Sequence, residues 1–102
     1  MAEKEAYTVI LGSDFQDLIP EFIENRRREL QALRVALAAG RYDQLSELGH
    51  RMKGIGTSYG FDRVSVLGGQ IEEQARIADG DALAARIAEY AEYLARVKVV
   101  YE

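Results

Sequence analysis

The chain of 102 residues contains a single histidine, His50, and no cysteine. The lack of cysteine excludes disulfides, thiolate nucleophiles and thiolate metal sites. A neutral imidazole is a good nucleophile near pH 7 and can form a covalent intermediate. Lys53 and Gly54 follow it by three and four residues, the spacing of neighbours on a helix surface. A cation and a missing side chain beside an imidazole suit an incoming phosphoryl group, so the three residues predict phosphoryl transfer at His50.

The same sequence lacks the parts needed to use ATP directly. It has no GxxxxGK[ST] loop, no kinase-type glycine loop and no evident cage for Mg²⁺. Phosphoryl transfer depends on positioning and on stabilising charge over the equatorial oxygens, and one lysine supplies little of that charge. We therefore expect a phosphotransfer protein without ATP-dependent kinase activity of its own.

Three glycines surround the histidine in a segment with helical spacing, where each costs about 1 kcal/mol relative to alanine. Gly49 and Gly56 lie nearer the side that faces the core, where close helix packing explains them at least as well as function does. Gly54 shares the exposed face of His50, and we expect it to give a partner access to the histidine.

Other polar residues near His50 have a simpler interpretation. Ser46 and Thr57 could hydrogen-bond the imidazole or a phosphoryl oxygen, although exposed hydroxyls are common. With one histidine and no cysteine, a zinc site would need three carboxylates, so we expect no metal site. The remaining acidic residues are interpreted as solvated helix charges: Glu47, Glu72-Glu73, Glu89 and Glu92.

Four segments with apolar residues at helical spacing must position these groups. Asp43 and Asp81 are expected to cap the second and fourth segments, and Ser13 with Gln16 forms a candidate capping box for a short turn before Pro20. The last segment keeps a heptad-like pattern through Val97 to Tyr101. The four predicted helices are 21–39, 43–60, 62–78 and 81–101.

The face that His50 occupies follows from the apolar positions of its helix. With about 100° per residue, the core positions cluster in one direction and His50 points about 180° away from their mean. We therefore expect His50 to face solvent. The core positions of this helix are Leu45, Leu48, Met52, Ile55 and Tyr59.

Short connections between four amphipathic helices favour an all-α, antiparallel up-down four-helix bundle. Residues 13–102 are assigned to the bundle, and residues 1–12 to a short N-terminal arm or helical turn. Only Tyr7 to Leu11 looks strand-like, and we expect it to lie on the bundle. A monomer is expected because the bundle uses the apolar stripe of each helix.

Composition narrows the classes of partner. Hydrophobic residues make up 48% of the chain and charged residues 29%, with a formal net charge of -4, so nucleic acid is not expected as a partner. Arg26-Arg27-Arg28 point in three directions on a helix and are interpreted as a solvated face. The apolar run after Ala6 is too short for a signal peptide or a membrane span. A cytoplasmic protein with no membrane partner is expected.

These residues carry a family resemblance. His50-Arg51-Met52-Lys53-Gly54, followed by Gly60, Leu67 and Ile71-Glu72, resembles the pattern of the histidine phosphotransfer (HPt) family: His-x-hydrophobic-Lys-Gly, a later glycine, a leucine and a hydrophobic-Glu pair. The stretch from Phe15 to Asp43 also resembles that family's opening helices. Ile55 and Gly56, which family members often replace by small polar residues, depart from the pattern, as does Gly68-Gly69. These departures bear on partner preference.

The resemblance implies that His50 is phosphorylated, that Lys53 assists at the phosphoryl site and that Gly54 clears the docking surface. It implies a phosphorelay intermediate of two-component signalling that takes the phosphoryl group from a receiver-domain aspartyl phosphate and passes it to another receiver aspartate. The expected partners are response-regulator receiver domains and a hybrid sensor histidine kinase. No cofactor is expected on this chain, and Mg²⁺ would be bound by the partner receiver domain.

Two alternatives remain open. The chain could be an HPt domain of a hybrid or chemotaxis histidine kinase, phosphorylated by a kinase domain; the start at Met1 and the end just past the fourth helix favour a complete small protein. It could also be a helical adaptor that carries no phosphate. The combination of His50, Lys53 and Gly54 argues against the adaptor, which would not need it.

Overall fold

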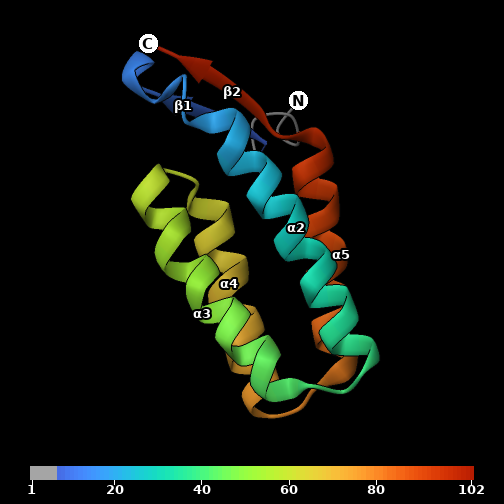
Figure 1. Ribbon diagram of the computed structural model, residues 1–102. Helices are drawn as coiled ribbons and strands as arrows, with labels where there is room; N and C mark the ends of the chain where they lie inside the picture. The colour runs from blue at the N-terminus through green and yellow to red at the C-terminus, as the bar shows by residue number, and fades with distance from the viewer. Residues whose placement is uncertain (1–6) are drawn as a thin grey trace.

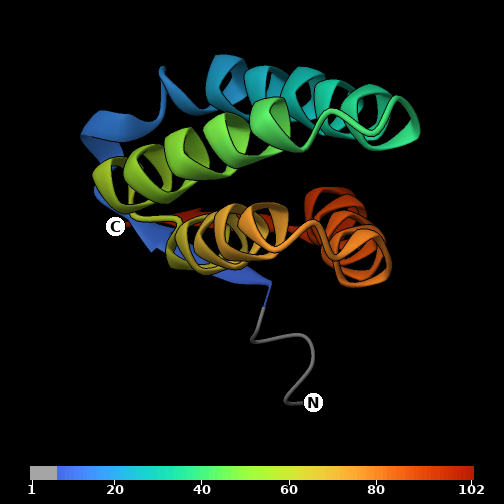
Figure 2. The same ribbon diagram turned by 90° about the horizontal axis from the view of Figure 1, so that it is seen from below.

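The computed structural model describes residues 7–102, and four long helices dominate them. Helix α2 spans Ile19–Ala38, α3 spans Tyr42–Tyr59, α4 spans Asp62–Arg76 and α5 spans Gly80–Arg96. They run up and down in alternation (Figure 1), and each packs beside the helix before it, with α5 returning to lie beside α2 (Figure 2). The predicted all-α four-helix bundle is confirmed.

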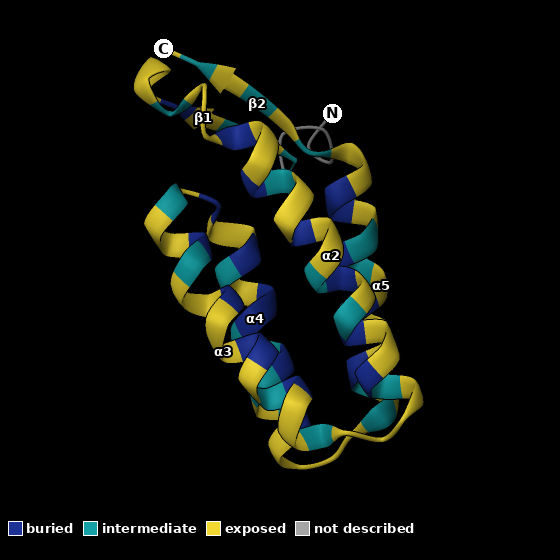
Figure 3. Cartoon of the chain, viewed as in Figure 1, coloured by how far each residue is buried: buried dark blue, intermediate teal, exposed yellow. Residues whose placement is uncertain are grey.

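The core lies along the helix faces that turn toward the inside of the bundle (Figure 3). The predicted core residues Leu45, Leu48 and Met52 of α3 are buried, while Ile55 and Tyr59 are half-buried against the core. One apolar stripe of each helix is therefore buried inside the bundle. The largest fully buried side chains include Leu33, Leu45, Met52, Phe61, Leu67, Ile71, Leu83, Tyr90 and Tyr93.

Several helix ends differ from the prediction. Asp79, and not Asp81, caps α5, because its carboxylate accepts a hydrogen bond from the Ala82 N–H at 3.1 Å. Helix α3 starts at Tyr42, and no side chain caps it, so Asp43 lies inside the first turn. Helix α4 ends at Arg76, two residues before the predicted end at Ala78, which adopts a left-handed φ of 53°. A cap must precede the first helical residue, which neither Asp43 nor Asp81 does.

The short turn before Pro20 is present, but the capping box is not. It is the 3-10 helix η1, Ser13–Phe15, and it follows Gly12 without a side-chain cap. Pro20 lies in the first turn of α2, where its missing N–H costs nothing. The predicted turn is therefore confirmed, whereas the predicted role of Ser13 and Gln16 was wrong.

The last helix does not continue to Tyr101 as predicted. It ends at Arg96, and Lys98–Tyr101 form strand β2, which pairs in parallel with strand β1, Thr8–Leu11. Val97, Val99 and Tyr101 alternate toward the core, and β-branched and aromatic residues favour strands. The strand-like segment of the predicted arm thus joins a small two-stranded sheet. The first six residues of that arm lie outside the described residues, and its boundary at residue 12 stays a prediction.

The arginine run of α2 is only partly solvated. Arg27 and Arg28 are exposed as expected, but Arg26 is buried. Its guanidinium stacks over the ring of Phe22, and its Nε lies 3.1 Å from Glu29 Oε1 without hydrogen-bond alignment. The interpretation of Arg26 as a solvated charge was wrong, because the residue lies on the side of α2 that faces α5. From α5, the Tyr90 hydroxyl donates a hydrogen bond to the same oxygen of Glu29 at 2.8 Å.

No helix among residues 7–102 is long and apolar enough to cross a membrane.

Candidate functional site

His50 lies in the middle of α3 with 71% of its side chain exposed. The face predicted from the helical periodicity is therefore the observed one. His50 lines a surface hollow of about 390 Å³. The hollow is lined by Ser46, Glu47, His50, Arg51 and Glu72.

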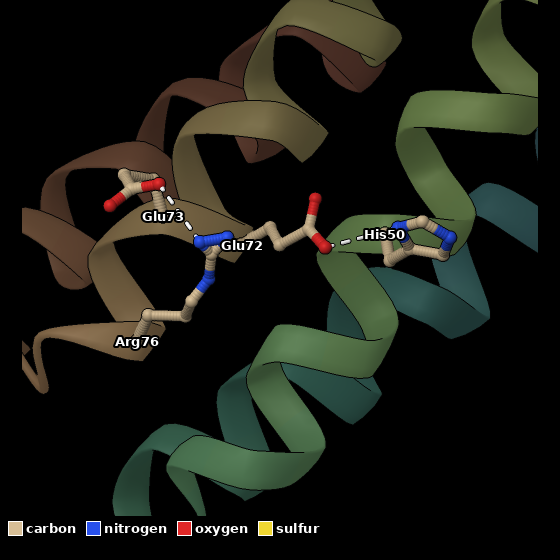
Figure 4. Close-up of polar contacts among 4 residues, drawn as sticks. All are labelled: His50, Glu72, Glu73 and Arg76. Atoms are coloured by element: carbon tan, nitrogen blue, oxygen red, sulfur yellow. Dashed lines mark hydrogen bonds and ion pairs between the residues drawn. The ribbon is translucent and has the colours of Figure 1, made fainter.

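The imidazole of His50 is held by a carboxylate from the neighbouring helix. Its Nδ1 lies 3.0 Å from Oε2 of Glu72, which projects from α4 and is only 22% exposed (Figure 4). A carboxylate can only accept, so Nδ1 must carry the proton and donate it. The neutral ring then has its lone pair on Nε2. The interpretation of Glu72 as a simple solvated charge was wrong.

Glycines bring Glu72 within reach of His50, because they let the backbones of α3 and α4 touch. A Cβ added to Gly49 would lie 2.6 Å from the backbone nitrogen of Glu72, and one added to Gly68 would lie 2.6 Å from that of Lys53. Gly56 meets α4 in the same way at Ser65. Close helix packing therefore accounts for Gly49 and Gly56, the explanation that the sequence already allowed.

Lys53 and Gly54 are both exposed on α3. A Cβ added to Gly54 would meet no atom within 4 Å, so no packing contact requires a glycine at this position. The stem of Lys53 passes beside Gly69 of α4, where an added Cβ would lie 3.8 Å from the lysine Cδ. The positions suit an open phosphoryl site, and the chemical roles of the two residues stay predictions.

The two hydroxyl residues considered in the sequence have different surroundings. Thr57 does not contact the imidazole: its hydroxyl donates to the carbonyl of Lys53 at 3.3 Å and lies 2.8 Å from the hydroxyl of Ser65. Ser46 lines the hollow that contains His50. Only Ser46 is therefore placed where it could reach a group bound at the histidine.

Glu72 and Ser65 contact this site but were not among the predicted site residues. They lie on one stripe of α4 with Gly68 and Gly69, at positions i, i+3, i+4 and i+7, which share a helix face. Two glycines on that stripe are a signal of close approach to another helix. Which helix approaches depends on the tertiary structure, so the pairing of Glu72 with His50 could not be read from the spacing.

The other charges nearby are directed elsewhere. Glu73, the neighbour of Glu72, pairs with Arg76 along α4 at 3.5 Å (Figure 4), and both side chains are more than half exposed. Such pairs contribute little to stability. Glu73 therefore fits the prediction of a solvated helix charge, whereas Glu72 does not.

This arrangement has the properties of an accessible nucleophile. The Nε2 lone pair belongs to an exposed ring, and bond formation at Nε2 would place positive charge on that ring. The Glu72 carboxylate lies against the opposite nitrogen, where it would stabilise this charge. A group that reacted with His50 at this nitrogen would have to approach from solvent.

Comparison with known proteins gave a match to a family model. A family model described as the Hpt domain matches residues 17–99, which include all four helices and His50. No curated protein and no solved structure gave a significant match to the chain.

Proposed function

This chain belongs to the Hpt domain family, whose members serve histidine phosphotransfer in phosphorelays, and we propose that His50 is the residue that carries the phosphoryl group. The observation that carries the proposal is the contact of Nδ1 with Glu72 at 3.0 Å on a ring that is 71% exposed. That contact assigns the proton to Nδ1 and the nucleophilic lone pair to Nε2.

In the proposed reaction, Nε2 attacks the phosphorus of a receiver-domain aspartyl phosphate. The Nε2–P bond forms, the acyl P–O bond breaks, and the electron pair leaves with the aspartate carboxylate. His50 keeps its Nδ1 proton and becomes a cationic phosphohistidine opposite Glu72. In the onward step, an aspartate of a second receiver attacks the phosphorus and the Nε2 lone pair is restored.

Lys53 and Gly54 have supporting roles in this proposal. The ammonium of Lys53 would stabilise charge on the equatorial oxygens, and the open space at Gly54 would let the receiver surface approach. One lysine supplies only part of the charge required. The receiver would supply the rest through its bound Mg²⁺, so this chain would need no cofactor and no ATP site of its own.

Hpt domains interact with receiver domains and kinases in two-component systems, and we propose receivers as both donor and acceptor here. A hybrid sensor histidine kinase would carry the donor receiver. A cytoplasmic location and a monomeric state, as expected from the sequence, complete the proposal.

The test is transfer from isotopically phosphorylated receiver domains to the purified chain. We expect an acid-labile, base-stable label on wild type and none on His50→Gln. Lys53→Ala should accept the label more slowly while remaining folded, because an exposed substitution usually costs within about 0.5 kcal/mol. Equal labelling of His50→Gln would contradict the proposal. Labelling by a kinase domain with ATP, but by no receiver, would show that the proposed donor is wrong.

A further inference from the structure

One stripe of α4 makes the contacts between that helix and the two functional residues of α3. Glu72, at one end of the stripe, contacts the imidazole of His50. The other three members contact the next turn of α3, which carries Lys53. They are Ser65, Gly68 and Gly69.

Hydroxyl groups from two helices lie within hydrogen-bond distance of the Lys53 carbonyl oxygen. Ser65 Oγ, from α4, donates to it at 2.7 Å, and Thr57 Oγ1, one turn along α3, lies 3.3 Å away. The two hydroxyls also lie 2.8 Å from each other. A mid-helix carbonyl has a second lone pair beyond the one used by its i+4 amide, so Ser65 joins the helices without breaking α3.

The nitrogen side of the same residue is also enclosed. The backbone of α4 is so close that a Cβ on Gly68 would lie 2.6 Å from the Lys53 nitrogen. Gly69 leaves room for the lysine stem, which passes at ordinary van der Waals distance from where a Cβ would be. Helix α4 thus fixes the backbone of Lys53 at both ends of the residue, while its side chain remains exposed.

We propose that Ser65 is a positioning residue for Lys53, holding the turn that presents the ammonium beside the phosphoryl group on His50. A charge that is already in place needs no reorganisation during the reaction, and small displacements of such groups are costly. The inference rests on the proposed function of His50.

The test is a double-mutant cycle on the initial rate at which phosphoramidate, a small phosphoryl donor, modifies the full chain, followed by intact mass spectrometry. We expect Lys53→Ala to slow modification about tenfold and Ser65→Ala about threefold. The double variant should be no slower than Lys53→Ala, because Ser65 would act only through the lysine. Ser65→Thr, which keeps the hydroxyl, should restore most of the rate.

Ser58→Ala is the matched control. It removes a hydroxyl that donates to the Gly54 carbonyl at 3.1 Å. This hydroxyl-to-carbonyl bond lies within α3 and does not involve Lys53, so the rate should not change. If Ser65→Ala fails to fold, Ser65→Cys replaces it in the cycle, since it keeps the size of the side chain but has only a weak S–H donor in place of the hydroxyl, and it should slow only chains that contain Lys53.

Other results would contradict either the role of Ser65 or the proposed function, and the two cases can be told apart. The inference is overturned if Ser65→Ala slows modification of the Lys53→Ala variant by the same factor as it slows modification of wild type. It is also overturned if Lys53→Ala slows modification and Ser65→Ala leaves the rate unchanged. An unchanged rate in Lys53→Ala overturns it as well, although modification of His50 would still support the proposed function. No modification of His50 by phosphoramidate or by any receiver contradicts the proposed function itself.

Discussion

In the proposed reaction, the residue that sets which nitrogen of His50 reacts lies 22 positions away in the sequence. Glu72 accepts a hydrogen bond from Nδ1–H, so the lone pair of the neutral ring lies on Nε2. That His50, Lys53 and Gly54 are exposed neighbours could be predicted from their spacing on one helix, since a helix fixes which positions are neighbours. The contact between Glu72 and His50 could not, because it depends on how closely α3 and α4 approach.

Substitutions of Glu72 should separate its hydrogen bond from its charge. Glu72→Ala removes the acceptor, and we expect modification by phosphoramidate to slow about tenfold. Glu72→Gln keeps an amide oxygen as acceptor but loses the charge, so its rate should fall between alanine and wild type. Nitrogen NMR of the imidazole should show the Nδ1–H tautomer in wild type and a mixture in the alanine variant. A wild-type rate in Glu72→Ala would contradict this role.

At the scale of the elements, the α3–α4 contact depends on glycines of both helices, of which the helical spacing placed those of α3 but not Gly68 of α4. Gly54 faces open space, as expected from its place on the exposed face, whereas a Cβ on Gly68 would meet the backbone of α3 at 2.6 Å. Two substitutions therefore have opposite expected effects on stability.

Gly68→Ala should lower the free energy of unfolding by about 1–3 kcal/mol, because its methyl group would overlap Met52 and Lys53 and separate the helices. Gly54→Ala should raise it by about 0.5–1 kcal/mol, because alanine favours a helix where space allows. Urea denaturation measures both. Equal effects of the two substitutions would show that the close approach of α3 and α4 is not what constrains Gly68.

The end of α5 shows where helical periodicity misleads. Leu94, Val97 and Tyr101 fit helical spacing, but Val97, Val99 and Tyr101 fit the alternation of a strand equally well. The partner of β2 is β1, about ninety residues earlier. Because the sequence between them gives no signal for that parallel pairing, the helix was predicted to continue.

At the scale of the whole molecule, the α2–α5 contact buries an ionisable cluster that the helical pattern did not predict. Glu29 lies beside Arg26 and accepts from the Tyr90 hydroxyl. Burial raises the pKa of Glu29 above its usual 4.5, against the opposing effects of Arg26 and Tyr90. The helical bundle could be predicted because four apolar stripes must pack together, but the polar group inside this interface could not.

This cluster predicts a pH dependence of stability. Because the pKa of Glu29 is raised on folding, the folded chain binds its proton more tightly than the unfolded chain does. The ionised group therefore opposes folding, and its effect grows as pH rises from about 4.5 through the raised pKa. Wild type should thus lose stability relative to Glu29→Gln over that window. Urea unfolding from acid to neutral pH measures the difference, and a constant or reversed difference would contradict the burial of Glu29.

The proposed phosphotransfer depends on which atom takes the phosphoryl group, and one measurement decides this most directly. The chain is treated with phosphoramidate and the modified residue is mapped by mass spectrometry, with phosphorus–proton NMR to identify the nitrogen. We predict a single phosphoryl group on Nε2 of His50 and none on His50→Gln. Modification of Nδ1, of another residue, or of the glutamine variant would contradict the proposed phosphotransfer.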